Sequence, residues 1–191
     1  MRQSVVLLLC CLSTFSVVGC KSQATREPAV DVTIDGDGKF PDFLVGRWKA
    51  DRGGWEFVFE PDGTISSAVV SIGRVTMKPG RTTTIPMQLG GKGVFVPGQW
   101  TVQYSHAQRE LIVEIVIDRF HIDLGDSVLR GRTRDFFVGS VSGDGQLWPA
   151  RRISFPEYIA DTKKYPNHRL PFDPNDSARE ELLFQKVKES K

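Results

Sequence analysis

Cysteine, histidine and net charge are all scarce in this sequence of 191 residues, and each shortage excludes a class of protein. Two of the three cysteines lie in the N-terminal apolar run at residues 5–18, so the rest of the chain holds only Cys20 and cannot form an internal disulfide. The three histidines, His106, His121 and His168, do not pair at zinc-binding spacing. With 25 basic and 23 acidic residues, the chain has no polybasic field for nucleic acid. We therefore expect no metal, no cofactor and no nucleic-acid partner.

The apolar run at residues 5–18 follows a short start with one basic side chain. The run is too short to cross a bilayer comfortably, and its flanks are typical of a secretory signal peptide. It ends in Val17-Val18-Gly19-Cys20, which resembles the lipobox of bacterial lipoproteins. The resemblance implies removal of residues 1–19 and acylation of Cys20, so that an N-terminal lipid anchors the protein to a membrane.

Lys21 follows the expected acylation site. In the sorting rule of many Gram-negative lipoproteins, Asp at this position retains the protein in the inner membrane, so Lys21 favours the outer membrane of the bacterial cell envelope. Residues 20–42 contain Ser, Thr, Pro, Asp and Gly with few large apolar side chains, which predicts a flexible tether. Within it, the spacing from Asp35 to Lys39 is similar to a calcium loop but lacks the final bidentate Glu, so we interpret it as a polar turn.

Residues 43–155 carry the pattern of an all-β domain. Trp55, Phe57 and Phe59 alternate with more polar neighbours, and the residues on both sides supply Gly and Asp for tight turns. Similar short runs recur at close intervals along the segment, which predicts an antiparallel barrel or sandwich of about eight to ten strands. The apolar positions change from odd to even numbers at Asp118-Arg119, which predicts a bulge or a turn there.

Residues 156–191 are expected to form an extended C-terminal tail with one short helix. The first part is rich in Pro, Tyr, Asp and Lys and has no periodicity. A capping box at Ser177–Glu180, followed by Leu183 and Val187 at i, i+4, predicts a helix from about residue 178 to 189.

Gly46-Arg47-Trp48, with the later Asp62-Gly63, resembles the opening of small lipocalin-like domains of bacterial lipoproteins, and a second Gly-x-Trp ends at Trp100. The resemblance implies an up-and-down antiparallel barrel or sandwich, and members of this family bind apolar molecules or act as assembly factors. Aromatic residues at strand period are more often core than ligand platform, and in a barrel the same residues would also line any cavity. These candidate residues are Trp55, Phe57, Trp100 and Tyr104.

Arg130, Arg132 and Arg134 alternate, so the sequence places them on one face of a strand. They form either an anion site for a carboxylate, phosphate or lipid headgroup, or an ordinary exposed face. Gly125-Asp126-Ser127 resembles the nucleophile block of a GDSL-type hydrolase, but no base is visibly placed to activate Ser127. We therefore expect a non-enzymatic envelope lipoprotein that binds a small apolar ligand. The alternatives are a lipoprotein that binds an envelope protein and, last, a serine hydrolase.

Overall fold

The structure is a computed structural model that describes most of the chain between residues 29 and 188. The described ranges are 29–36, 38–70, 74–87, 91–125, 127–161 and 178–188. The predicted signal peptide, Cys20 and His168 lie outside these ranges, so the structure does not bear on them.

Twelve strands make up one sheet. Their bounds are β1 Val30–Ile34, β2 Gly46–Ala50, β3 Glu56–Phe59, β4 Ile65–Val70, β5 Val75–Met77, β6 Thr83–Pro86, β7 Lys92–Pro97, β8 Trp100–Ser105, β9 Glu110–Asp123, β10 Val128–Ser140, β11 Leu147–Asp161 and β12 Ala178–Lys186.

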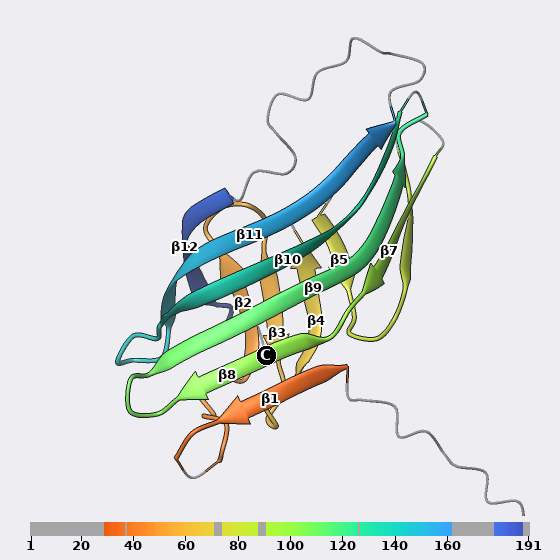
Figure 1. The fold of residues 1–191 in the computed structure, drawn as a ribbon. Helices are drawn as coiled ribbons and strands as arrows, with labels where there is room; N and C mark the ends of the chain where they lie inside the picture. Colours follow the sequence, from red (N-terminus) through yellow and green to blue (C-terminus); the bar gives the residue numbers. More distant parts are fainter. Residues whose placement is uncertain are drawn as a thin grey trace, which may run out of the picture.

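The strands follow the order β1-β8-β9-β10-β11-β12-β2-β3-β4-β5, and every pair is antiparallel except β1 with β8. The hairpin β6–β7 joins the second half of β9, while β8 pairs with the first half. The sheet bends over on itself, so that β2 to β5 lie behind the long strands β9 to β11 (Figure 1). Among the described strands, β1 and β5 are not paired with each other, and the sheet is not closed. The predicted all-β fold is confirmed. The sheet is antiparallel as predicted except at β1–β8, and the structure has twelve strands where about eight to ten were expected.

The hairpin β2–β3 shows how local sequence produces this fold. Trp55, Phe57 and Phe59 are each no more than 2% exposed, as the alternation predicted. Gly53 and Gly54 adopt φ angles of 70° and 72° in the turn between the strands, a region that favours glycine. A second turn follows the strand, where Gly63 has a φ of 84° and donates its N–H to the carbonyl of Glu60 at 2.9 Å. These two turns bound β3 on both sides, and one face of the strand is buried.

Aromatic side chains from both layers fill the space between them. Phe57 stacks on Phe184 at 5.3 Å between ring centroids and meets Phe137 edge-on at 5.1 Å. Trp148 stacks on Phe184 at 4.8 Å, and its indole N–H donates to the carbonyl of Gly139 at 3.1 Å. Because these rings contact one another directly, they form a packed aromatic core between the two layers. A barrel that binds a ligand inside would need open space at this place.

A bulge at Asp118 changes the register of β9. Ile117 lies opposite Thr133 of β10, but Phe120 lies opposite Gly131, so β9 contains one additional residue here. Consequently the buried apolar residues are odd-numbered up to Ile117 and even-numbered from Phe120 onward. The predicted register change at Asp118-Arg119 is confirmed as a bulge within one continuous strand.

The expected boundaries at both ends of the domain need correction. β1 lies within the predicted tether at residues 20–42, and β11 continues through the predicted start of the tail to Asp161. The helix predicted from about residue 178 is the strand β12, which pairs with β11 on one side and β2 on the other. A short helix is only marginally stable by itself, whereas β12 gains two neighbouring strands and buries Leu182 and Phe184.

Candidate functional site

The aromatic residues predicted to line a ligand cavity belong to the core. The exposed fraction of Trp55, Phe57, Trp100 and Tyr104 lies between 0 and 4%. The indole N–H of Trp100 donates to the carbonyl of Val116 at 3.0 Å, which fixes the ring against β9. These four residues and the predicted arginines do not form one site, because the arginines lie on the opposite face of the sheet.

Arg130, Arg132 and Arg134 do share one face, as their spacing predicted. All three are exposed, while Thr133 and Asp135 between and beside them are buried. The outer face of β9, β10 and β11, meaning the face turned away from the core, therefore carries the arginine row.

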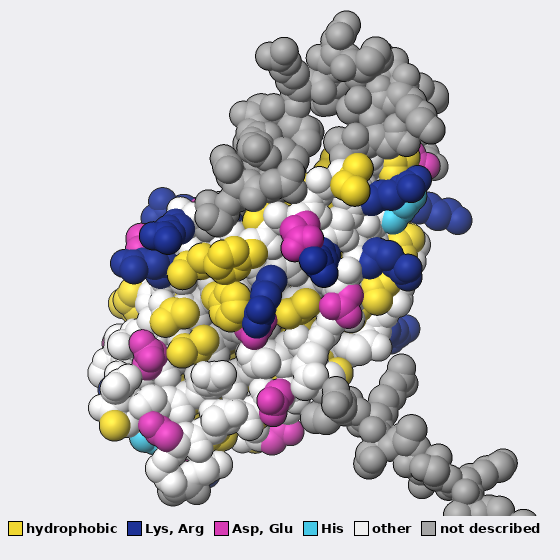
Figure 2. Space-filling model, viewed as in Figure 1, with side chains coloured by type: hydrophobic (Ala, Val, Ile, Leu, Met, Phe, Trp, Pro, Cys, Tyr) yellow, Lys and Arg dark blue, Asp and Glu magenta, His cyan; other side chains and the backbone are white. Residues whose placement is uncertain are grey.

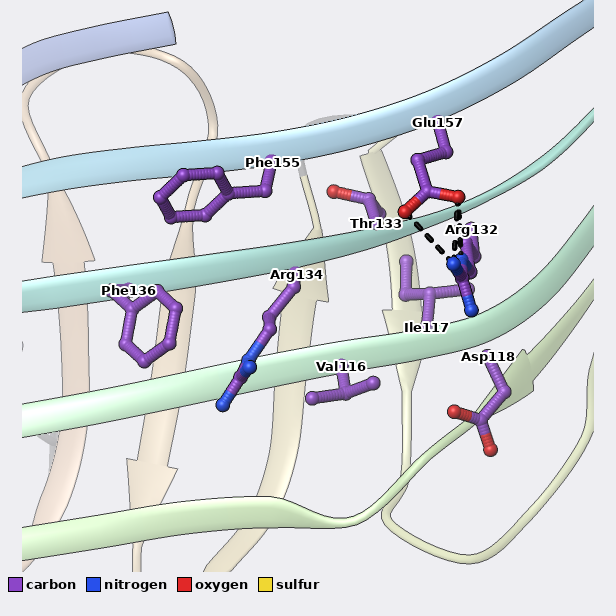
Figure 3. Close-up of a pocket in the computed structure, with 9 residues that line it drawn as sticks. All are labelled: Val116, Ile117, Asp118, Arg132, Thr133, Arg134, Phe136, Phe155 and Glu157. Atoms are coloured by element: carbon purple, nitrogen blue, oxygen red, sulfur yellow. Dashed lines mark hydrogen bonds and ion pairs between the residues drawn. The ribbon is translucent and has the colours of Figure 1, made fainter. Parts of the chain in front are cut away.

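An open groove with a volume of about 600 Å³ crosses this outer face. Its lining residues come from the three long strands, as Figure 3 shows, and we call it the aromatic groove. They are Val116, Ile117, Asp118, Arg132, Thr133, Arg134, Phe136, Phe155 and Glu157.

Two of the three arginines are neutralised by carboxylates at the aromatic groove. Arg132 donates from Nε and Nη2 to the two carboxylate oxygens of Glu157 at 2.8 and 2.9 Å, and this pairing raises the pKa of Arg132. Arg134 pairs with Glu114, which raises the pKa of Arg134, and its guanidinium also lies 4.8 Å from the ring centre of Phe136. These two arginines therefore line the groove as members of ion pairs.

The apolar part of the groove includes two phenylalanines on neighbouring strands, beside Val116 and Ile117. Phe155 is 50% exposed, and its ring meets Phe136 edge-on at 6.0 Å between centroids. Figure 2 shows hydrophobic side chains gathered on this face among scattered basic and acidic ones. Exposed aromatic side chains bordered by paired charges are typical of protein interfaces, where an apolar centre is surrounded by a polar rim.

The sequence analysis missed Phe136, Phe155 and Glu157. Phe155 and Glu157 lie at the boundary of the expected domain, so their strand was not recognised there. The available signal was alternation: Ile153, Phe155, Glu157 and Ile159 occupy every second position and share the outer face of β11.

The two other motifs named from the sequence, at Ser127 and at Asp35, lie at turns. Ser127 lies in the turn between β9 and β10, where its carbonyl accepts the N–H of Leu124 at 2.9 Å, so it is not on a strand-to-helix turn. The Asp35 carboxylate accepts the backbone N–H of His106 at 2.6 Å, which suits a polar turn.

Across the described ranges, no group of three or more potential ligands could hold a metal ion. No helix in the part of the chain that the structure describes has the length and hydropathy to span a membrane.

Comparison of the chain with protein-family models, with curated proteins and with solved structures returns no match.

Proposed function

We propose that this chain is a lipid-anchored protein of the bacterial cell envelope whose β domain binds a protein partner through the aromatic groove, without catalysing a reaction. The anchor follows from the resemblance of Val17-Val18-Gly19-Cys20 to a lipobox, and Lys21 favours the outer membrane. The proposal for the β domain depends on the groove.

One contrast supports binding of a partner over binding of a ligand inside the domain. The aromatic residues that would line an interior cavity pack against one another, whereas Phe155 is half exposed on the outer face. A cup for an apolar ligand needs an interior cavity of about 300 Å³ or more. A binding scaffold needs a filled core and an exposed apolar patch, and this combination favours the scaffold.

Photo-cross-linking in cells tests this proposal. The photoreactive residue p-benzoylphenylalanine would replace Phe155 in the groove or, as a matched control, Leu147 on the outer face of the same strand. We expect one discrete protein adduct from position 155 and none from position 147. Phe136→Asp should remove the adduct, because it places a charge in the apolar part of the groove.

The other outcomes decide against a protein partner. Equal adducts from both positions would mean that the groove has no special role. An adduct at position 155 with the mass of a small apolar molecule would instead place the ligand-binding function on the outer face.

A further inference from the structure

A second hollow of about 630 Å³ lies beside the aromatic groove, where β7 joins β9. Its lining residues include Arg119 and His121 of β9, Arg130 of β10 and Ile159 of β11. In the ladder, Arg130 lies opposite both His121 and Ile159. Figure 2 shows basic side chains gathered around a histidine near this end of the sheet. Three side chains that can donate hydrogen bonds to an anion therefore line one concave surface.

The bulge at Asp118 creates this arrangement. Before it, the odd-numbered residues of β9 face the core, as Ile115 and Ile117 do. Without the additional residue, Arg119 and His121 would also point into the core, where an unpaired charge is costly. The register shift places both on the outer face, and β-bulges commonly redirect side chains near functional sites.

Neither the Arg119 nor the Arg130 side chain has a hydrogen bond or ion pair with any described residue, in contrast to Arg132 and Arg134. The acidic residues nearby have other contacts. Glu157 holds Arg132, and Asp123 accepts the backbone N–H of Gly125 at 2.8 Å in the hairpin turn. The Asp118 carboxylate lies against Gly98, where an added Cβ would overlap it. The two guanidiniums therefore line the hollow without an ion pair to a described carboxylate, although Asp118 and Glu157 also line it.

We propose that Arg119, His121 and Arg130 form a binding site for a phosphate group. Guanidinium groups match the oxygens of phosphate in bidentate geometry, and an imidazole adds a further donor. Ile159, which is 75% exposed beside the site, would contact an apolar group attached to the phosphate. The phosphate could therefore belong to a free anion or to a lipid headgroup, and the two sources are separable by experiment. The site does not require the aromatic groove to bind a protein.

Calorimetric titration of the purified full chain in a neutral detergent tests the site. The probes are inorganic phosphate, dihexanoyl phosphatidic acid and, as a zwitterionic comparison, dihexanoyl phosphatidylcholine. We expect inorganic phosphate to bind, and Arg119→Gln and Arg130→Gln each to weaken that binding by about tenfold, the effect of losing a charged hydrogen bond. Arg151→Gln is the matched control, because Arg151 is exposed on the outer face of β11 but pairs with Glu181 at 2.7 Å outside the hollow.

The two lipids identify the source of the phosphate. Phosphatidic acid that binds about tenfold more tightly than inorganic phosphate, with the excess lost in Ile159→Asp, indicates a lipid headgroup. Equal affinity for both indicates a free phosphate anion. The proposal is overturned if neither inorganic phosphate nor phosphatidic acid binds. It is also overturned if Arg151→Gln weakens binding as much as Arg130→Gln does. Equal binding of phosphatidylcholine and phosphatidic acid, with no binding of phosphate, would overturn it as well.

Discussion

Arg152 donates from Nε and Nη2 to a single carboxylate oxygen of Asp135, at 2.9 and 2.7 Å, inside the domain. Thr133 donates to the other oxygen at 3.0 Å, and the guanidinium lies 5.0 Å from the ring centre of Trp55. Asp135 is 2% exposed. This pair therefore places both charges in the interior, each with partners, on the side of the sheet opposite to the arginine row.

Removing the carboxylate should strongly destabilise the domain. Among the described residues, Asp135→Ala leaves the Arg152 charge with one carboxylate, the more distant Glu180 at 3.4 Å, and breaking a buried pair typically costs about 3–5 kcal/mol. Glu157→Ala removes an exposed pair, for which a loss of about 0–1 kcal/mol is usual. Urea denaturation of the two variants measures the difference. Equal free energies of unfolding would show that the interior pair is not special.

The aromatic face of β3 supports a second prediction. Phe57 is fully buried against Phe137, Trp148 and Phe184, so Phe57→Ala should lower the free energy of unfolding by about 3–5 kcal/mol. Glu56 on the opposite face pairs with Lys49 at 3.4 Å, and Glu56→Ala should change stability by less than about 1 kcal/mol. Thermal melts of both variants decide the matter. If Phe57→Ala retained its melting temperature but lost binding of an apolar dye, this face would line a cavity.

The sequence predicted best those features that one strand determines alone. In β3, apolar and more polar residues alternate, and at Asp118 the apolar positions change from odd to even numbers. Both patterns indicate which side of a strand faces the core, and the structure has both as predicted. Ten of the twelve strands begin within the expected domain at residues 43–155. Local pattern was sufficient here because each strand is bounded by its own turn.

The errors concern features that only the whole sheet determines. β1 and β12 have sequences suited to a tether and a helix, and both become strands because an edge or a gap in the sheet accepts them. The spacing of Arg130, Arg132 and Arg134 at every second residue was enough to place them on one outward face. It could not show which of them would form an ion pair with a carboxylate on β9 or β11. That depends on strand order, since Glu114 and Glu157 are far from β10 in sequence.

The turn after β3 predicts a dependence on pH. Asp62 accepts hydrogen bonds from the hydroxyl and the backbone N–H of Thr64 at 2.7 and 2.9 Å, and these lower the pKa of Asp62. A carboxyl whose folded pKa lies below its unfolded value, about 3.9, stabilises the folded state above that pH and loses this contribution as pH falls. Wild type should therefore be more stable than Asp62→Asn at pH 7. The difference should shrink below about pH 4, and a difference that grew in acid would contradict this assignment.

The lipid anchor gives the fourth prediction. Cys20→Ser removes the thiol that the lipobox would present for acylation, so the variant should appear in the soluble fraction when cells are broken and centrifuged. Metabolic labelling with a radioactive fatty acid should mark the wild type and not the variant. If Cys20→Ser sediments with membranes to the same extent as wild type, the lipoprotein hypothesis is wrong.

Gly131 gives the last prediction, which concerns the spacing of β10 and β11. A Cβ at this position would overlap the carbonyl oxygen of Glu157 and come within 2.9 Å of Phe120 and 3.0 Å of Tyr158, two rings that meet edge-on at 5.0 Å. Gly131→Ala should therefore lower stability by about 1–3 kcal/mol, the usual range for overpacking.

Gly143→Ala is the matched control for this prediction, because an added Cβ there has no neighbour within 4 Å among the described residues. Gly131 also lines the hollow beside Arg130, so a shift of β11 should weaken phosphate binding in Gly131→Ala but not in Gly143→Ala. Equal stability of the two variants would mean that β10 and β11 separate without cost. The close approach of these strands at Gly131 would then not be what positions Ile159 beside the arginines.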